Sequence, residues 1–221
     1  MHRVICIDGP AGAGKSTVAK AIAKKLGYLY VDSGSFYRAV TWHAMRSGVD
    51  CADPEAMAAF CQTLTPSFVK RENAMVCLLN GHELNEEIRT PEVNANVSPV
   101  ATAKGVRQCV TEWLRAMRNE GNIIVEGRDI GSVVFPDSPA RFYIDANPDE
   151  RARRRHKEEC AKGMGGSEEK VKASLLNRDR IDSSRATAPL KIPEGAIVID
   201  TTCLSIDEVV DAIVSRICTG A

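Results

Sequence analysis

The segment from Gly9 to Ser16 constrains this chain more than any other part of its sequence. It reads GPAGAGKS, it follows a short apolar run at residues 4–7, and a helical pattern comes after it. Glycines let the backbone wrap tightly enough for successive N–H groups to point at one anion, and the N-terminal end of the next helix adds positive charge. A strand, a loop of this pattern and a helix, in that order, predict a phosphate-binding loop.

The residues of this loop have distinct chemical tasks. Lys15 can reach the outer phosphates of a nucleoside triphosphate, and the Ser16 hydroxyl is placed to bind the Mg²⁺ that accompanies them. We therefore expect a nucleotide here, with Mg²⁺ as its cofactor. The predicted nucleotide-binding residues are Gly9, Pro10, Ala11, Gly12, Ala13, Gly14, Lys15, Ser16 and Thr17.

Short apolar runs alternate with helical patterns along the rest of the chain. Five runs are continuous in their apolar character, which is typical of parallel strands covered on both faces. They are residues 4–7, 29–31, 123–125, 141–144 and 196–199. Of the helices between and after them, the first is expected to end at Gly27, and the last to begin with a capping box of Ser205 and Glu208. We predict a single α/β domain over residues 1–221, of the P-loop NTPase type, with a five-stranded parallel sheet flanked by helices.

Two segments break the alternation. Residues 75–79 and 82–84 look like antiparallel strands joined by a tight turn at Asn80 and Gly81, so we expect residues 40–100 to form an insertion with a small antiparallel β-meander. A glycine-rich joint at residues 162–167 follows a run of arginines, and we expect a short helical lid at residues 151–168.

Composition narrows the classes of function. The chain has 221 residues, 29 Lys+Arg against 29 Asp+Glu, and only 5% aromatic residues, which disfavours nucleic-acid binding. No apolar run approaches the roughly 18 residues that span a bilayer, and Asp8 interrupts the N-terminal apolar stretch too early for a signal peptide. The eight cysteines lack CxxC or zinc-ligand spacing, so we expect reduced thiols in a cytoplasmic protein.

Polar segments follow the second and third apolar runs, where ligands bind in open α/β sheets. After the second run comes DSGSFYR, in which Arg38 can hold the phosphate of an acceptor; the alternative is a helix start capped by Ser33 or Ser35. After the third run, Glu126 resembles a Walker-B acid. Arg128 and Asp129 can then recognise an acceptor through hydrogen bonds. The alternative is a surface ion pair that stabilises the fold by ~0–1 kcal/mol.

Two groups of arginines follow. The first, on one helical face, is suited to closing over a migrating phosphoryl group, although a solvated charged face is the alternative. It consists of Arg151, Arg154 and Arg155. In the second group, Arg178, Asp182 and Arg185 recur on one face of a helix, which we expect to end at Pro189. The alternative to a binding role for this group is a structural ladder of salt bridges.

Together these segments resemble the bacterial-type cytidylate (CMP) kinases, which are P-loop nucleoside monophosphate kinases. The resemblance covers nearly the whole chain and rests on GPAGAGKST, DSGSFYR, GRDIGSVVFPD at residues 127–137 and RATAPL at residues 185–190. It implies transfer of the ATP γ-phosphate to CMP, with dCMP as a second acceptor, by a core, an NMP-binding insertion and a lid. The expected partners are the small-molecule substrates ATP and CMP or dCMP, with no nucleic acid and no membrane, and a monomer suffices for this chemistry.

The resemblance also implies roles for single residues. Those matching catalytic positions are Lys15, Arg128, Arg151, Arg154 and Arg155. The CMP phosphate is held at positions matching Arg38, Arg128 and Arg185, and the cytosine is recognised at Ser98, Arg107 and Asp129. Positions matching Arg178 and Asp182 contact the ribose, and Ser33 supplies a further hydroxyl. Ile181 and Ser183 stand where some relatives carry arginines, so the preference between ribose and deoxyribose stays open.

Two other functions remain as alternatives. One is a P-loop kinase for another acceptor, such as UMP, AMP or a small alcohol like shikimate. The other is a nucleotide-dependent switch of the GTPase kind. The sequence disfavours it, because neither the N-K-x-D motif nor the D-x-x-G motif occurs.

Overall fold

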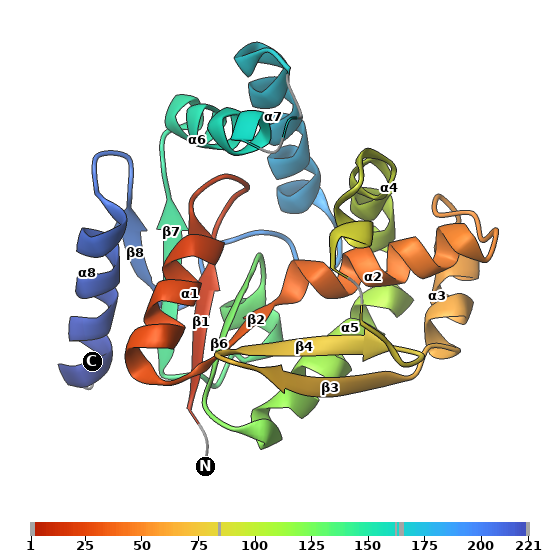
Figure 1. Ribbon diagram of the computed structural model, residues 1–221, viewed down its shortest axis with the longest axis horizontal. Helices are drawn as coiled ribbons and strands as arrows, with labels where there is room; N and C mark the ends of the chain where they lie inside the picture. Colours follow the sequence, from red (N-terminus) through yellow and green to blue (C-terminus); the bar gives the residue numbers. More distant parts are fainter. Residues whose placement is uncertain (1–2, 84, 162, 164–165, 220–221) are drawn as a thin grey trace. The chain divides into compact units, whose positions relative to one another are not determined.

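The structure is a computed structural model that describes residues 3–83, 85–161, 163 and 166–219. Its contacts group the chain into two compact units. The first unit consists of Met1–Val4 and Ala23–Val125, and the second of Ile5–Ile22 and Glu126–Ala221. Both contain strands flanked by helices (Figure 1), which confirms the α/β class.

The first unit contains the predicted insertion. Its helices are α2 (Ser33–Arg46), α3 (Pro54–Gln62), α4 (Pro91–Thr102) and α5 (Lys104–Ala116), with 3-10 turns η1 (Glu86–Arg89) and η2 (Met117–Glu120). Its strands lie in the order β3 (Pro66–Arg71), β4 (Ala74–Leu79), β2 (Leu29–Asp32) and β6 (Ile123–Gly127), whose last two residues belong to the second unit. Strand β5 (His82–Glu83) pairs with β4.

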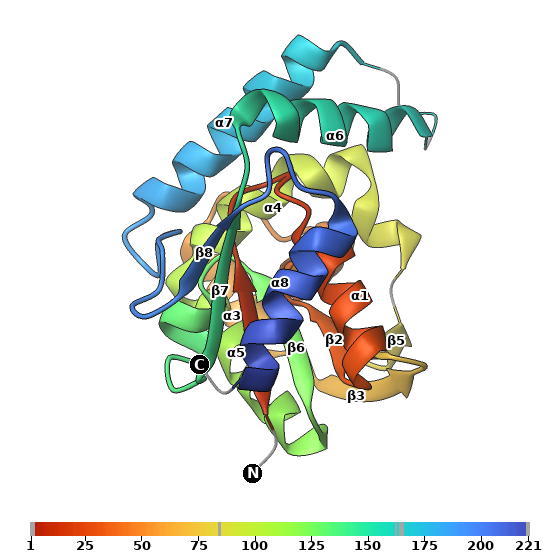
Figure 2. The same cartoon turned by 90° about the vertical axis from the view of Figure 1, so that its left-hand side faces the viewer.

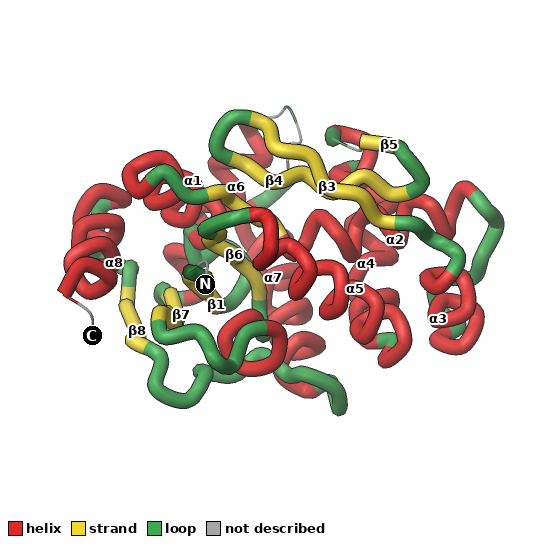
Figure 3. Tube along the Cα trace, turned by 90° about the horizontal axis from the view of Figure 1, so that it is seen from below, coloured by secondary structure: helices red, strands yellow, loops and turns green. Residues whose placement is uncertain are grey.

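The antiparallel β-meander is confirmed within this unit. Strands β3 and β4 lie side by side (Figure 3) and pair antiparallel, and β4 continues into β5 through a turn in which Asn80 and Gly81 have φ angles of +51° and +78°. These positive angles are those that a tight hairpin turn requires. Residue 84, predicted to end the hairpin, lies outside the described residues.

One pairing of the insertion was not predicted. Tyr30 of β2 pairs in parallel register with Ala74 of β4, so the meander extends the sheet instead of standing apart from it. The predicted boundaries at residues 40 and 100 fall inside α2 and α4. The assignment of residues 40–100 as an NMP-binding insertion stays a prediction.

The second unit contains the glycine-rich loop. Its strands lie in the order β1 (Val4–Asp8), β7 (Ala140–Asp145) and β8 (Ile197–Asp200). Its helices are α1 (Lys15–Leu26), which ends in the first unit, α6 (Pro148–Ala161), α7 (Glu168–Ser184) and α8 (Ile206–Thr219), with a short π-helical turn η3 (Ile130–Val134). Helices α6 and α7 pack against each other, as Figure 2 shows.

Parallel register brings three loops of this unit to one edge. Asp8 is in register with Tyr143, and Asp145 is in register with Asp200, so β1, β7 and β8 all end at the same side of the sheet. The segments that leave this edge are the glycine-rich loop, the β7–α6 connection and the β8–α8 connection. A ligand-binding site is expected at such an edge.

Local signals in the sequence are confirmed at several helix ends. Gly27 follows α1 with a φ of +67°, the left-handed conformation of a helix C-cap. Before α8, the Ser205 N–H donates to Glu208 Oε2 at 2.8 Å and the Glu208 N–H donates to Ser205 Oγ at 3.3 Å, which is the predicted capping box.

The expectation that all five strands are covered on both faces is wrong for β8. Its residues alternate between half-buried and exposed, and Val198 is 51% exposed. Strand β8 stands at the end of the strand order, so its apolar run reflects an edge strand. All eight cysteines are free thiols, and within the described ranges no helix has the length and apolar character needed to cross a membrane.

Asp8 ties the end of β1 to the turn after β6 inside the second unit. Its Oδ1 accepts the Ile130 N–H at 2.8 Å, and its Oδ2 accepts the Gly131 N–H at 2.7 Å. Burial raises the pKa of the carboxyl from 3.8 to about 6, although the two backbone N–H groups oppose the shift.

The raised pKa predicts how Asp8 affects stability. Its contribution is fully present below pH 3.8 and is lost as pH rises through about 6, because the folded protein binds the proton more tightly than the unfolded chain. We expect the unfolding free energy of the wild type, minus that of Asp8→Asn, to fall between pH 4 and pH 7, by about 3 kcal/mol at most. Urea unfolding across this range measures it, and a difference that stays flat or rises contradicts the assignment.

Candidate active site

The glycine-rich loop passes very close to its neighbours in the second unit. A Cβ on Gly9, whose φ is +149°, would lie 2.0 Å from the Ile144 carbonyl oxygen. A Cβ on Gly12, whose φ is +76°, would lie 3.0 Å from the Arg151 carbonyl oxygen. A side chain at residue 9 would collide with the backbone, and one at residue 12 would be strained and tightly packed, so glycine lets the loop wrap against β7 and α6.

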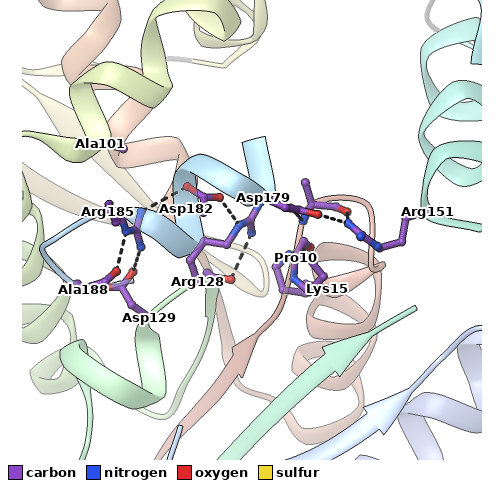
Figure 4. Close-up of polar contacts among 12 residues, drawn as sticks. Pro10, Lys15, Ala101, Arg128, Asp129, Arg151, Asp179, Asp182, Arg185 and Ala188 are labelled. Carbon is purple, nitrogen blue, oxygen red and sulfur yellow. Dashed lines mark hydrogen bonds and ion pairs between the residues drawn. The ribbon is translucent and has the colours of Figure 1, made fainter. Parts of the chain in front are cut away.

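Lys15 is buried at the first position of α1. Its Nζ donates to the Pro10 carbonyl oxygen at 2.7 Å, so the side chain folds back over its own loop, as Figure 4 shows. Burial and the nearby positive charge of Arg128 lower the pKa of the ammonium, Glu126 opposes them, and the net pKa is about 7. A phosphate anion beside Nζ would supply the negative charge that this buried cation needs.

Ser16 and Glu126 together form the part of the site that fits Mg²⁺. The Ser16 hydroxyl donates to Glu126 Oε1 at 2.5 Å, which joins the start of α1 to the end of β6. Both side chains present hard oxygen atoms, the kind that Mg²⁺ prefers when phosphates and water supply its other ligands. Among the residues that the structure describes, no group of three His, Cys, Asp or Glu side chains could hold a metal ion.

Beside the loop lies a buried network of arginines and carboxylates, shown in Figure 4. Arg128 Nε donates to Asp182 Oδ2 at 3.0 Å. Arg185 connects Asp182 and Asp129, at 3.4 Å and 3.2 Å, and its Nε also donates to the Ala188 carbonyl oxygen at 2.6 Å. The side chains of Arg185, Asp129 and Asp182 are 4%, 7% and 8% exposed. This part of the second unit therefore presents guanidinium groups that are held rigidly in place.

Three expectations about this network are corrected. The alternative of a surface ion pair between Arg128 and Asp129 is wrong, because Arg128 pairs with Asp182 and Asp129 pairs with Arg185. Helix α7 was expected to run to Pro189, but it ends at Ser184. Arg185 therefore lies at the helix C-cap, with an extended φ and ψ of −64° and 139°, and not on the helical face that carries Asp182.

The arginines of α6 differ in their surroundings. Arg151 is buried, and its guanidinium donates to the carbonyl oxygens of Ala146 and Ala11 at 3.0 and 2.9 Å and pairs with Asp179. It therefore holds the loop in place and does not stand over it. Residues 162, 164 and 165 of the predicted glycine-rich joint lie outside the described part of the chain.

Arg154 pairs with Glu150 of its own helix and also lies beside the loop, whereas the observed ion pairs of Arg155 are with residues of its own helix. The Arg154 guanidinium donates to the Thr201 hydroxyl at 3.0 Å and to the Thr201 carbonyl at 2.7 Å, and its Nη1 would lie 3.8 Å from a Cβ on Gly14. Arg155 forms ion pairs with Glu158 and Glu159, at 3.1 and 2.8 Å. Arg154 therefore lies beside the loop at Gly14, and Arg151 contacts it at Ala11.

In the first unit, Asp32 organises the start of α2. Its side chain accepts the Ser35 N–H at 3.1 Å, so Asp32 is the N-cap, and the alternative that Ser33 or Ser35 caps the helix is wrong. Asp32 also pairs with Arg89 at 3.2 Å. Ser33 is the buried first residue of the helix, and Arg38, one turn further on, donates to the Asn94 side chain of α4.

Arg107 is buried at the start of α5 in the same unit. Its Nη1 donates to the Ala101 carbonyl oxygen at 3.1 Å, and its guanidinium lies over the Tyr37 ring, 5.4 Å from the centroid. Ser98 is half-buried on α4. The structure thus gathers Ser33, Arg38, Ser98 and Arg107 on the packed helices α2, α4 and α5, and the remaining predicted site residues belong to the second unit.

Two carboxylates of the site were not among the predicted site residues. Glu126 was compared with a Walker-B acid but was not assigned as a ligand. Its position at the end of an apolar strand could have identified it as a site residue, and in the structure it accepts from Ser16. Asp179 carried no such signal, because it stands inside an alternating Arg-Asp-Arg run that is typical of a solvated helix face. Its contacts come from tertiary packing.

Comparison with known proteins agrees with this geometry. The model of the cytidylate kinase family matches residues 5–219. A cytidylate kinase of Clostridioides difficile (strain 630) is 45% identical over 214 residues, which cover 97% of each chain. A cytidylate kinase of Geobacter sp. (strain M21) is 42% identical over 208 residues, which cover 94% of this chain and 89% of the relative.

A solved structure supports the fold alone. An uncharacterized protein from Eubacterium ventriosum is 12% identical with a TM-score of 0.57, and the match covers 99% of both chains. The family match, in contrast, spans nearly the whole sequence, and close relatives share more than two fifths of their residues with it. This chain belongs to the cytidylate kinase family.

Proposed function

We propose that this protein transfers the γ-phosphate of ATP to CMP and gives ADP and CDP. The observation that carries the proposal is the pairing, within one unit, of a phosphate loop with buried Lys15 and a rigid arginine–carboxylate network beside it. The family membership supports the choice of donor and acceptor. A rival acceptor, such as UMP, AMP or a small alcohol, has no such support.

The chemistry requires positioning and charge neutralisation, since no covalent intermediate with the enzyme is needed. The loop N–H groups and Lys15 hold the triphosphate, and Arg154 stabilises the charge on the migrating group from α6. Arg38, Arg128 and Arg185 hold the acceptor phosphate, whose oxygen attacks the γ-phosphorus in line. Ser16 would hold the Mg²⁺ that accompanies ATP, and the ion would supply further neutralisation of phosphate charge.

Recognition of the acceptor follows from hydrogen-bonding chemistry. Cytosine carries a donating amino group where uracil carries a carbonyl oxygen, so a carboxylate such as Asp129 favours cytosine over uracil. Ser98 and Arg107 complete the proposed cytosine contacts. The proposed ribose contacts are Arg178 and Asp182, and dCMP is the proposed second acceptor.

We also propose that the enzyme acts as a cytoplasmic monomer. The support is chemical: all eight cysteines are free thiols, which suits a reducing compartment, and one chain carries every residue the proposed reaction uses.

A panel of acceptors tests the function directly. At fixed ATP and Mg²⁺, we expect CMP to give the highest kcat/KM, dCMP to follow, and UMP and AMP to be at least about 100-fold poorer, because a polar pocket rejects a base that leaves its groups unpaired. A coupled assay of ADP release measures each acceptor. Preference for UMP would defeat the role of Asp129, and nucleotide hydrolysis without any acceptor would favour a switch.

A further inference from the structure

Ala11 of the phosphate loop contacts helices α6 and α7 through its side chain, its carbonyl oxygen and its N–H. Its side chain is buried in an apolar cluster with Ala152 of α6 and with Val171 and Leu175 of α7. Its carbonyl oxygen accepts from Arg151, and its N–H donates to Asp179 Oδ1 at 3.0 Å. The first turn of the loop is therefore docked on both helices, inside one unit.

Asp179 is the unusual member of this group. Its two oxygens bind a loop N–H and the Arg151 guanidinium, and its side chain is only 15% exposed. A loop N–H and a guanidinium side by side are the donors that hold a phosphate oxygen elsewhere in proteins. The carboxylate thus has the charge and the hydrogen-bonding pattern of an anionic ligand.

The charges around Asp179 indicate that its carboxylate opposes the binding of a nucleotide. Lys15, Arg128 and Arg178 lie close enough together for their charges to affect one another, and Asp179 contributes negative charge to Arg128. In the protein without nucleotide, this carboxylate offsets part of that positive charge. When a triphosphate enters the loop, the same carboxylate becomes a like charge next to it.

We propose that Asp179 is a carboxylate latch: it holds the Ala11 N–H and Arg151 in the nucleotide-free enzyme, and the incoming triphosphate displaces it, so that Asp179 lowers the affinity of the loop for ATP. The identity of the nucleotide, ATP, rests on the proposed function. Asp179 is a positioning residue, because it acts through the loop and Arg151.

The variant Asp179→Asn separates this proposal from a purely structural role. Asparagine has the same shape and can still accept the Ala11 N–H, but it carries no charge. The latch predicts that the Kd for ATP falls about fivefold or more, since removing a competing charge is worth a typical coupling between two binding events. A structural support predicts the opposite sign, because a loosened loop binds ATP more weakly.

The matched control is Asp149→Asn. Asp149 forms an ion pair with Lys172 that also joins α6 to α7, but Asp149 is largely exposed, and none of its observed hydrogen bonds involves the loop. Its Kd for ATP is expected to stay within twofold of the wild type. Equal changes in the two variants would overturn the latch.

Titration calorimetry with ATP, and separately with inorganic tripolyphosphate, measures both variants. Tripolyphosphate tests the loop without base or acceptor, so tighter tripolyphosphate binding by Asp179→Asn supports the latch even if no CDP is formed. Unchanged or weaker binding of both ligands overturns it. Should Asp179→Asn fail to fold, the ¹³C carboxyl resonance of Asp179 in the wild type decides, because it must move when tripolyphosphate is added; an unmoved resonance overturns the proposal.

Discussion

Replacing Lys15 with methionine is expected to lower kcat/KM for phosphoryl transfer by about 10³-fold or more and to leave the fold intact. The ammonium supplies preorganised positive charge in a buried site, where one such donor is worth about 10²–10³ in rate, and arginines that perform the same task reach 10³–10⁵. Methionine keeps most of the alkyl length, so the loss is mainly one of charge.

The stability of this variant is expected to be unchanged or higher at neutral pH. The pKa of Lys15 falls from 10.5 to about 7 on folding, so the folded state loses stability through this group as pH falls from 10.5 toward 7. Methionine removes that cost. Lys20→Met, on the exposed face of the same helix, is the matched control. Turnover of Lys15→Met equal to that of the control in the ADP-release assay would refute the assignment of the loop.

Replacing Arg185 with methionine is expected to destabilise the protein by about 3–5 kcal/mol. Arg185 is almost fully buried between Asp129 and Asp182, so its removal leaves two buried carboxylates without their shared cation. Asp182 keeps its bond from Arg128. Urea unfolding at pH 7 measures the change.

Two further variants define the source of this effect. Arg180→Met removes an exposed arginine of α7, the helix that ends just before Arg185. The Arg180 side chain donates to Asn177, and the variant is expected to change the unfolding free energy by less than about 0.5 kcal/mol. Adding Asp129→Asn to Arg185→Met removes one of the two carboxylate charges that Arg185 balances, so the double variant is expected to be more stable than Arg185→Met alone. A loss below 1 kcal/mol for Arg185→Met would mean that the buried pairs contribute little.

Features that depend on neighbours in the sequence were predictable. The glycine-rich loop, the C-cap at Gly27, the capping box of Ser205 and Glu208 and the turn at Asn80 all follow from local backbone preferences, and the structure confirms these elements. Each is decided within a few residues, where sequence and conformation are directly linked.

Features that depend on tertiary packing were not predictable from the pattern. Arg128 and Asp129 are neighbours in the sequence, but in the fold they pair with different residues, Asp182 and Arg185. Likewise, a charged run at residues 178–185 gives no sign that Asp179 is the acidic residue that contacts the loop. Partner choice among several arginines and acids is set by distances that only the fold supplies.

The close approach of Gly9 to the Ile144 carbonyl oxygen has a genetic consequence. Every single-base change in a glycine codon that alters the amino acid introduces a residue with a Cβ, and here that atom would lie 2.0 Å from a backbone oxygen. No point mutation of this codon can therefore be both non-synonymous and sterically neutral. Natural variation in this enzyme should spare residue 9 for that reason alone, whatever nucleotide the loop binds.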